Sequence, residues 1–237
     1  MTLKVALCLS GQPRSYREGF EYHSKNLLDR YNVDTFIHTW DYVPEKMLDN
    51  IAELYDPVYV STETPTKTEI EKTLEKYQNK KSPSEQFPIE NTMLMFYSMF
   101  KSFEHVHLLY DVIVRSRFDY ALNISPPLHL TAVNKLYVPS DRMTSEHDFC
   151  ADMFAWGTYP AMKRYMETFK YIGKIVEDPN VPFIGEELLS RQLINSGLTG
   201  DNMVYVDMNN PFPPGKYNGN WHSILRNDFT DWNKLRD

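Results

Sequence analysis

The chain has 237 residues, of which 42% are hydrophobic and 24% charged, an ordinary globular composition that excludes a disordered chain. Its net charge of -7 argues against a nucleic-acid-binding protein, which would carry a basic excess. The two cysteines, Cys8 and Cys150, have no zinc-site spacing and are predicted to be buried thiols. The apolar run at 5–9 is too short for a signal peptide or a membrane span, so we expect a cytoplasmic protein without a transmembrane segment.

Strands and helices alternate in the first sixty residues. Apolar runs predict strands at 4–10, 33–40 and 57–61, the last at a sheet edge. Helical spacing predicts helices at 16–31 and 46–55. Gly11 and Pro13 enforce a loop after the first strand, and Ser15 is placed to cap the first helix. This order with short links implies parallel strands joined by right-handed crossovers.

The next stretch is polar and is followed by the strongest helix signal in the chain. Residues 65–77 predict an exposed helix and 79–88 a mobile loop, so this stretch is a solvated insertion or, alternatively, a lid that responds to substrate. Residues 90–110 contain no glycine or proline and predict a long helix with two apolar faces, which leads straight into a strand. Its polar members Tyr97, Ser98 and Lys101 either face a site or, for the lysine, point to water.

The C-terminal half shows shorter elements. Strands are predicted at 135–138, 152–157 and 204–208. Helices are predicted at 158–174 and 186–196, the second closed by Gly197. Loops are predicted at 143–148 and 179–185, and the tail at 210–237 is irregular.

The stretch at 110–120 (YDVIVRSRFDY) is the most informative one, because its apolar run ends in Arg115, Arg117 and Asp119. Charges at the end of a buried strand are costly unless they have a function. In open α/β sheets, ligands bind outside the carboxyl ends of the strands. Arginines there can bind a diphosphate through paired hydrogen bonds, and Asp119 can hold a divalent cation that bridges phosphates.

Polar residues also follow the first two predicted strands. Ser10, Gly11 and Arg14 follow the first, and Asp41 follows the second. Parallel strands would bring all of them to the edge that carries Arg115, where Asp41 can accept hydrogen bonds from a ribose or a base. Asp41 can instead cap the next helix. No P-loop, dinucleotide fingerprint or nucleophile elbow is present, and the combination suits a nucleotide diphosphate ligand.

Four runs resemble one group of enzymes: 8–15 (CLSGQPRS), 33–41 (VDTFIHTWD), 110–119 (YDVIVRSRFD) and 152–157 (DMFAWG). They are similar to small GT-A-type glycosyltransferases of large DNA viruses and bacterial polysaccharide loci. The resemblance implies one α/β domain with a Rossmann-like, mostly parallel central sheet flanked by helices. Residues 1–120 would bind the nucleotide-sugar donor, and 121–237 would form the acceptor side and tail.

The resemblance also implies a glycan acceptor and Mn²⁺ or Mg²⁺ held by a D-x-D motif. Residues 117–119 (RFD) occupy its place, so an arginine replaces the first acid. Two alternatives follow: Asp119 binds the metal with a tail residue such as His222, or Arg117 takes part of the cation's role.

An inverting enzyme of this kind needs a carboxylate that deprotonates the acceptor hydroxyl. The candidates are Asp152, Glu186 and Glu187, although acids in a helix first turn are common and a retaining enzyme needs no such base. We therefore predict a glycosyltransferase that moves a sugar from a nucleotide-diphosphate donor to a glycan. The alternatives are a nucleotidyltransferase and a non-catalytic protein that binds nucleotide sugars or carbohydrate.

Overall fold

The computed structural model describes residues 3–64, 75, 89–139, 150–206 and, for the backbone alone, 222–224. The predicted helix at 65–77, the loops at 79–88 and 143–148 and most of the tail at 210–237 lie outside these ranges, apart from single residues and the short 222–224 segment. No helix in the described ranges has the length and apolar character needed to cross a membrane.

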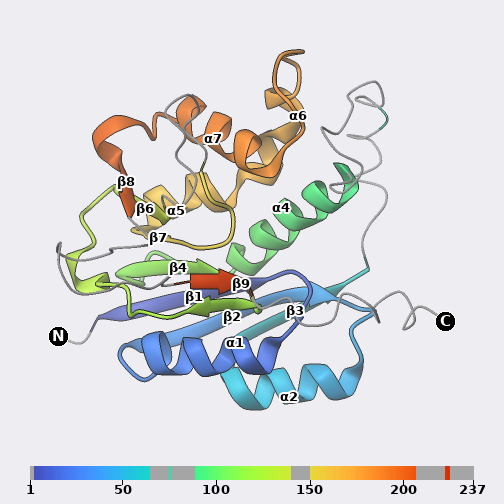
Figure 1. Cartoon of the computed structure of the whole chain (residues 1–237), viewed down its shortest axis with the longest axis vertical. Coiled ribbons are helices and arrows are strands. Elements are labelled where there is room, and N and C mark those ends of the chain that lie inside the picture. Colours follow the sequence, from blue (N-terminus) through green and yellow to red (C-terminus); the bar gives the residue numbers. More distant parts are fainter. Residues whose placement is uncertain (1–2, 65–74, 76–88, 140–149, 207–221, 225–237) are drawn as a thin grey trace.

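A seven-stranded mixed sheet runs through the molecule in the order β3-β2-β1-β4-β7-β6-β8 (Figure 1). Its parallel half consists of β1 (Lys4–Ser10), β2 (Asn32–Trp40), β3 (Tyr59–Glu63) and β4 (Val112–Ser116). Its other half consists of β7 (Ala155–Gly157), antiparallel to β4, then β6 (Leu136–Pro139) and β8 (Met203–Val206). A separate pair is formed by β5 (Tyr120–Leu122) and β9 (His222–Ile224).

Helices cover both faces of the sheet. One face carries α1 (Tyr16–His23), which continues as a π-helical turn (Ser24–Leu28), and α2 (Glu45–Tyr55) (Figure 1). The other face carries α4 (Ile89–Phe103), α5 (Tyr159–Met166), α6 (Ile172–Ile175) and α7 (Gly185–Asn195). Short 3₁₀ turns lie at Leu128–Leu130, Thr168–Tyr171 and Gly200–Asn202.

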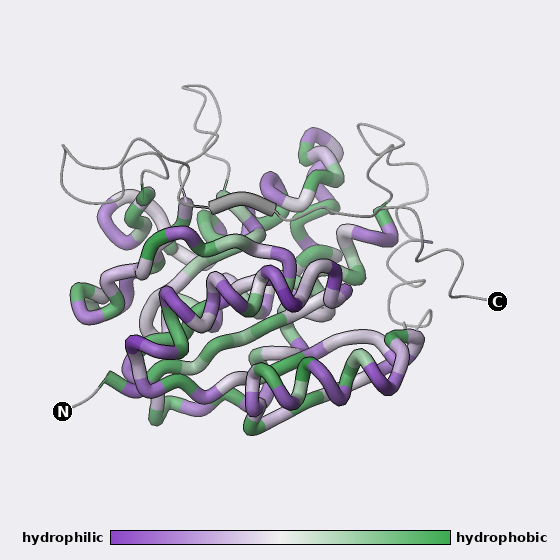
Figure 2. The backbone as a smooth tube through the Cα atoms, turned by 60° about the horizontal axis from the view of Figure 1, so that its bottom comes forward, coloured by the Kyte–Doolittle hydropathy of each residue, from purple (hydrophilic) through white to green (hydrophobic). Residues whose placement is uncertain are grey.

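Strand β1 lies between two hydrophobic cores. Its side chains alternate between them, with Ala6 and Cys8 in the core under α4 and Leu7 and Leu9 in the core under α1 and α2. Because both faces are covered, the strand is a continuous apolar run, which is typical of a parallel sheet. Figure 2 shows the resulting pattern of hydrophobic strands inside and helices of mixed hydropathy outside.

The stretch at 110–120 was predicted as one strand, and this prediction was wrong. β4 ends at Ser116, a turn follows in which the Tyr120 N–H donates to the Arg117 carbonyl at 3.3 Å, and β5 leaves the main sheet. The preceding helix α4 also ends early, at Phe103. The chain must reverse direction between a crossover helix and its parallel strand, so the residues after Phe103 form that reversal and cannot remain helical.

Two further local predictions were wrong. Ser15 precedes α1 in a left-handed conformation (φ 43°) and makes no side-chain capping bond. The predicted helix at 158–174 is interrupted after Met166, where the Thr168 hydroxyl donates to the Tyr165 carbonyl at 2.8 Å. A side chain that bonds to the local backbone in this way competes with the helical ladder. The helix at 186–196 was predicted well, and Gly197 ends it with a positive φ of 78°.

Candidate functional site

The carboxyl ends of the four parallel strands form one edge of the sheet. The register pairs Ser10 with His38, Trp40 with Glu63, and Leu9 with Ser116, so the four strands end side by side. The convergence that the sequence predicted for these strand ends therefore follows from their parallel pairing. This edge is where an open α/β sheet binds its ligand.

Gly11 makes the turn at the end of β1. Its φ of +99° is unfavourable for any residue with a side chain, and a Cβ atom there would meet nothing within 4 Å. Backbone conformation and not crowding therefore requires glycine here, and the turn borders open space. The Gly11 N–H donates to the His38 carbonyl at 3.2 Å and to Ser98 Oγ at 2.8 Å, which fixes α4 against the turn.

His38 lies fully buried beneath this turn. Its Nδ1 is 2.7 Å from Ser98 Oγ, and its Nε2 has no hydrogen-bond partner among the described residues. The ring packs edge-on against Trp40, with 4.9 Å between centroids. Burial lowers the pKa of His38 to about 4, so the imidazole is neutral at pH 7. One ring nitrogen is satisfied, as expected for a core histidine, and the other is not.

The polar side of α4 faces the strand ends, which decides between the two interpretations of its polar residues. The Tyr97 hydroxyl donates to Glu63 at 2.6 Å, and Lys101 Nζ lies 3.2 Å from the same carboxylate. Partial burial works to raise the pKa of Glu63, but these two partners outweigh it and hold the pKa below its usual value. Glu63 was not among the predicted site residues, because the third strand was predicted to end at residue 61 and not at Glu63.

The loop after β1 and the end of β2 hold the other predicted ligand-binding residues. The Ser10 side chain is buried, and its hydroxyl has no hydrogen-bond partner in the described part of the chain. Arg14 donates to the side chain of Gln12, which itself donates to the Tyr42 hydroxyl at 2.8 Å. Asp41 is exposed and accepts a hydrogen bond from Thr64.

Asp41 does not cap the next helix. The residue that precedes α2 is Pro44, which makes no side-chain capping bond. The capping interpretation of Asp41 is therefore wrong, and its carboxylate stays at the sheet edge beside Thr64.

Arg117 and Asp119 form a fork-to-fork ion pair in the turn after β4. Arg117 Nε and Nη2 each donate to a different Asp119 oxygen, both at 2.7 Å. Asp119 is 1% exposed, whereas the Arg117 side chain is 26% exposed. Burial works to lower the pKa of Arg117, and the carboxylate of Asp119 raises it above its usual value. A buried carboxylate needs such a partner, and a planar guanidinium supplies it with two bonds at once.

Arg115 is a buried cation at the end of β4. It is 1% exposed, its Nη1 donates to the Met153 carbonyl at 2.6 Å, and its Nε has no hydrogen-bond partner among the described residues. Burial lowers its pKa, while Tyr165 and Asp152 oppose that effect. A guanidinium with an unsatisfied N–H is suited to an anionic ligand at this edge.

The antiparallel direction of β7 brings Asp152 to this same edge. Ala155 pairs with Arg115, so the residues before β7 lie beyond the carboxyl end of β4. Asp152 Oδ2 would lie 3.4 Å from a Cβ atom placed on Gly185, the first residue of α7. The Asp152 carboxylate therefore lies beside the first residue of α7.

The three acids predicted as a base are placed differently. Burial raises the pKa of the Cys150 thiol, and the carboxylates of Asp152 and Glu186 raise it further, which locates both acids near one point. Glu187 instead accepts a hydrogen bond from Arg191 Nε at 3.0 Å, one turn along α7. The structure thus places Asp152 beside the start of α7, which carries Glu186, and pairs Glu187 with Arg191 on the same helix.

The described residues do not by themselves fit a divalent cation. No group of three or more His, Cys, Asp or Glu side chains within the described ranges is placed to hold one. Both oxygens of Asp119 are engaged by Arg117, whose charge would repel a dication. The backbone of His222 pairs with Leu122 in β5, and its side chain lies outside the described part. A metal held by Asp119 and His222 therefore stays a prediction.

No protein-family model and no curated protein sequence matches this chain. Solved structures are similar to it at low sequence identity. An active-site mutant of LgtC has a TM-score of 0.54 and 12% identity, covering 86% of this chain and 72% of that one. The galactosyltransferase LgtC in complex with donor and acceptor sugar analogues has a TM-score of 0.52 and 12% identity, with 86% and 73% covered. The apo form of mouse xyloside xylosyltransferase 1 has a TM-score of 0.48 and 7% identity, covering 87% of this chain and 86% of that one.

At these identities the likeness establishes the fold. The chain is a single-domain α/β protein with a GT-A-like, mostly parallel central sheet, as the sequence predicted.

Proposed function

We propose that this GT-A-like chain is a glycosyltransferase that moves a sugar from a nucleotide-diphosphate donor to a glycan acceptor. The observation that carries the proposal is the pair of arginines at the carboxyl end of β4, where Arg115 is buried with an unsatisfied N–H. A buried cation is costly unless something compensates it, and a diphosphate would do so. The similarity to a galactosyltransferase solved with donor and acceptor sugar analogues supports the choice of reaction.

The donor's diphosphate would lie along the edge formed by β1 and β4. The Gly11 turn has no side chain and borders open space, which allows close approach to the backbone. Arg115 and Arg117 supply guanidinium groups for the phosphate oxygens, and Asp119 holds Arg117 in position through two bonds of 2.7 Å. Ser10 and Asp41 are the candidates for contacts with the ribose or base.

Transfer breaks the bond between the sugar's anomeric carbon and the diphosphate oxygen, which leaves with the bonding electrons. Arginines placed at that oxygen stabilise the negative charge as it develops. We assign this task to Arg115 and Arg117. No step is assigned to a metal, because the described residues do not fit one.

In an inverting reaction the acceptor hydroxyl attacks the anomeric carbon from the opposite face and loses its proton to a carboxylate. We propose Asp152 as that base, with Glu186 beside it. Asp152 lies close enough to Arg115 and Arg117 to influence the pKa values of both, so a base there would be near the leaving group's binding site. Glu187 is the weaker candidate, since its carboxylate already accepts a bond from Arg191.

Two other functions would use the same edge of the sheet. A nucleotidyltransferase would usually have a glycine-rich basic loop after its first strand, and here Gly11 and Arg14 alone resemble it. A non-catalytic binding protein would show the same nucleotide binding without turnover. Measurement of transfer, in addition to binding, separates it from the enzyme.

Thermal unfolding with UDP, GDP, CDP and dTDP, each with and without Mn²⁺, tests the proposal. At about a hundredfold excess over Kd, a ligand adds roughly 2.7 kcal/mol to stability. For a chain of this size, we expect one nucleoside diphosphate to raise Tm by roughly 5–10 °C. Arg117→Gln should reduce that shift, whereas Arg17→Gln, at an exposed site on α1, should leave it unchanged.

The absence of any response to the four nucleotides would contradict the proposal. An additional shift with Mn²⁺ that Asp119→Asn removes would support the predicted metal site. A shift that is equal with and without Mn²⁺ would support the arginines as the counter-charge.

A further inference from the structure

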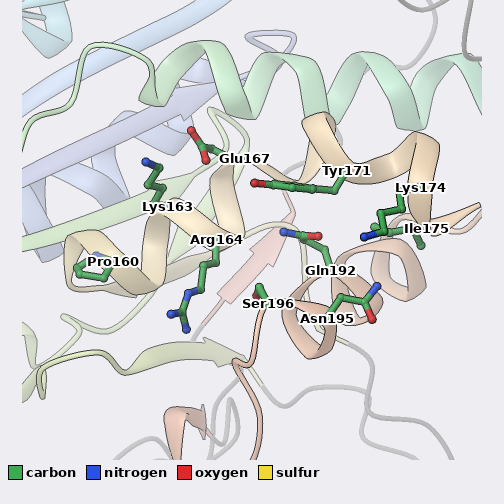
Figure 3. Close-up of a pocket in the computed structure, with 10 residues that line it drawn as sticks. All are labelled: Pro160, Lys163, Arg164, Glu167, Tyr171, Lys174, Ile175, Gln192, Asn195 and Ser196. Carbon is green, nitrogen blue, oxygen red and sulfur yellow. The ribbon is translucent and has the colours of Figure 1, made fainter.

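A hollow with a volume of about 670 Å³ lies among the helices that cover the α4 face of the sheet (Figure 3). Its walls are α5, the 3₁₀ turn Thr168–Tyr171, α6 and the C-terminal end of α7. The size is within the range of small-molecule sites in proteins. α7 begins beside Asp152 and has 11 residues, so the hollow at its other end is about 15 Å from the proposed base.

Three cations line this hollow without acidic partners. Lys163, Arg164 and Lys174 make no ion pair within the described ranges. Glu167 also lines the hollow, but its carboxylate is paired with Lys170 at 2.7 Å. In a chain of net charge -7, three cations around one hollow are a local exception. They favour a ligand that carries negative charge.

Gln192 supplies a polar group at the base of the hollow. It is 4% exposed, yet its side-chain amide makes no hydrogen bond to any described residue. Figure 3 shows it reaching from α7 into the space between Tyr171 and Arg164. Because this amide lines the hollow and has no described partner, its carbonyl and NH₂ groups can pair with ligand hydroxyls that both donate and accept.

Tyr171 gives the hollow an aromatic wall. The residue is 43% exposed, and Figure 3 shows its ring lying flat across the upper side of the space. A half-exposed tyrosine offers an apolar face together with a polar tip, and a sugar ring offers an apolar C–H face with hydroxyls at its rim. The positive charge, the amide of Gln192 and the aromatic face of Tyr171 thus match three features of one ligand class.

We propose that this hollow is a second binding site, for a saccharide that carries a carboxylate or a phosphate group. Lys163, Arg164 and Lys174, which stand around the hollow, supply the positive charge that attracts the anionic group, Gln192 binds ring hydroxyls, and Tyr171 packs against the ring. The binding is independent of the proposed transfer reaction. If the chain also transfers sugars, the site is placed to hold an acidic unit of a glycan away from the donor.

Calorimetric titration of the full chain without nucleotide tests this site. The probes are glucuronate and glucose 6-phosphate, which separate the two anionic groups, with glucose and inorganic phosphate as controls. We expect at least one charged sugar to bind, and glucose and phosphate each to bind at least tenfold more weakly. Binding should weaken as NaCl rises from 50 to 500 mM, because surface charge is screened.

Two variants locate the binding. The double change Lys163→Gln and Lys174→Gln should weaken binding of the charged sugar at least tenfold, and Gln192→Ala should do so while the variant still unfolds cooperatively. Lys46→Gln, an exposed lysine on α2 across the sheet, is the matched control and should bind normally.

No binding of either charged sugar at millimolar concentration would overturn the proposal. Equal binding of phosphate alone would overturn it as a saccharide site, and so would unchanged affinity in the double variant. The titration contains no nucleotide, so its failure is distinguishable from a failure of the proposed transferase function.

Discussion

At the scale of single residues, the charges beyond β4 depend on one another. Arg117 neutralises the buried Asp119 through two bonds of 2.7 Å, while Arg115 is left with an unsatisfied N–H. Removing one partner of a buried pair leaves the other charge uncompensated, which typically costs 3–5 kcal/mol. Variants at Asp119 therefore need a stability measurement beside any activity measurement.

Asp152 should separate binding from chemistry. Asp152→Asn keeps the shape of the side chain but cannot accept the acceptor's proton. We expect transfer to fall by roughly 10²–10⁴-fold while the thermal shift with nucleotide stays within about 2 °C of wild type. Transfer is measured as nucleoside diphosphate released in the presence of acceptor.

The matched control for this prediction is Asp49→Asn, an exposed aspartate on α2, which should transfer sugar at the wild-type rate. Glu186→Gln tests the neighbouring acid. If Asp152→Asn and Glu186→Gln both transfer at the wild-type rate, neither acid is the base, and Glu187 or a retaining mechanism becomes the alternative.

At the scale of elements, α1 positions the turn that holds Arg117 and Asp119. A Cβ atom on Gly19 would lie 1.8 Å from the Phe118 carbonyl oxygen, so the helix backbone packs directly on the turn. A clash with backbone cannot be relieved by a rotamer change. One face of α1 thus fixes the height of the turn above the sheet edge.

Gly19→Ala should therefore disturb both stability and the site. We expect a loss of about 1–3 kcal/mol, seen as a fall in Tm of roughly 3–10 °C, together with a smaller nucleotide-induced shift. Gly173→Ala is the control, because its Cβ would meet nothing within 4 Å in α6, and it should be neutral or slightly stabilising. A Gly19→Ala variant as stable as wild type would show that the helix moves away without cost.

At the scale of the whole molecule, the sheet has a buried neutral histidine on each face. His38 lies under α4, and His23 lies between Tyr55 and Ser116 on the α1 side, with ring nitrogens 2.9 and 3.0 Å from their hydroxyls. Burial lowers the pKa of His38 to about 4 and that of His23 to about 3. Both lie below the usual value near 6.5 of an unfolded chain.

Stability should therefore fall as the pH drops from about 6.5 toward 4. In that range the unfolded chain binds a proton at each histidine and the folded chain does not, so each contributes a slope of up to roughly 1.4 kcal/mol per pH unit. This slope is measured by urea unfolding between pH 7 and pH 5, a range that lies above the usual pKa values of most carboxylates. His38→Gln should lower the difference in bound protons between the unfolded and folded chains by about one, and the slope of stability against pH falls with it. His107→Gln, at an exposed site, should leave the slope unchanged. Identical slopes for His38→Gln and wild type would contradict a neutral buried His38.

The parallel half of the fold and the polar residues at its strand ends could be predicted from the sequence. Apolar runs such as the one in β1 are local signals, since a strand buried on both faces must be apolar throughout. The same local signal singled out Arg115, Arg117 and Asp119. A charged residue at the end of an apolar run can be recognised in the sequence without knowing which residue it pairs with. The resemblance of these runs to GT-A enzymes was enough to predict the fold.

Which of these residues contact one another could not be predicted, because most of the contacts join different elements. The contacts of Ser98 and Lys101 from α4 and the antiparallel β7 that brings Asp152 to the edge beside Arg115 depend on how distant segments approach. The hollow beside Gln192 likewise needs α5 and α7 together. The Arg117–Asp119 pair instead forms within the turn after β4. Local patterns fix which face of an element is buried, whereas the partner across that face is set by packing between elements far apart in the chain.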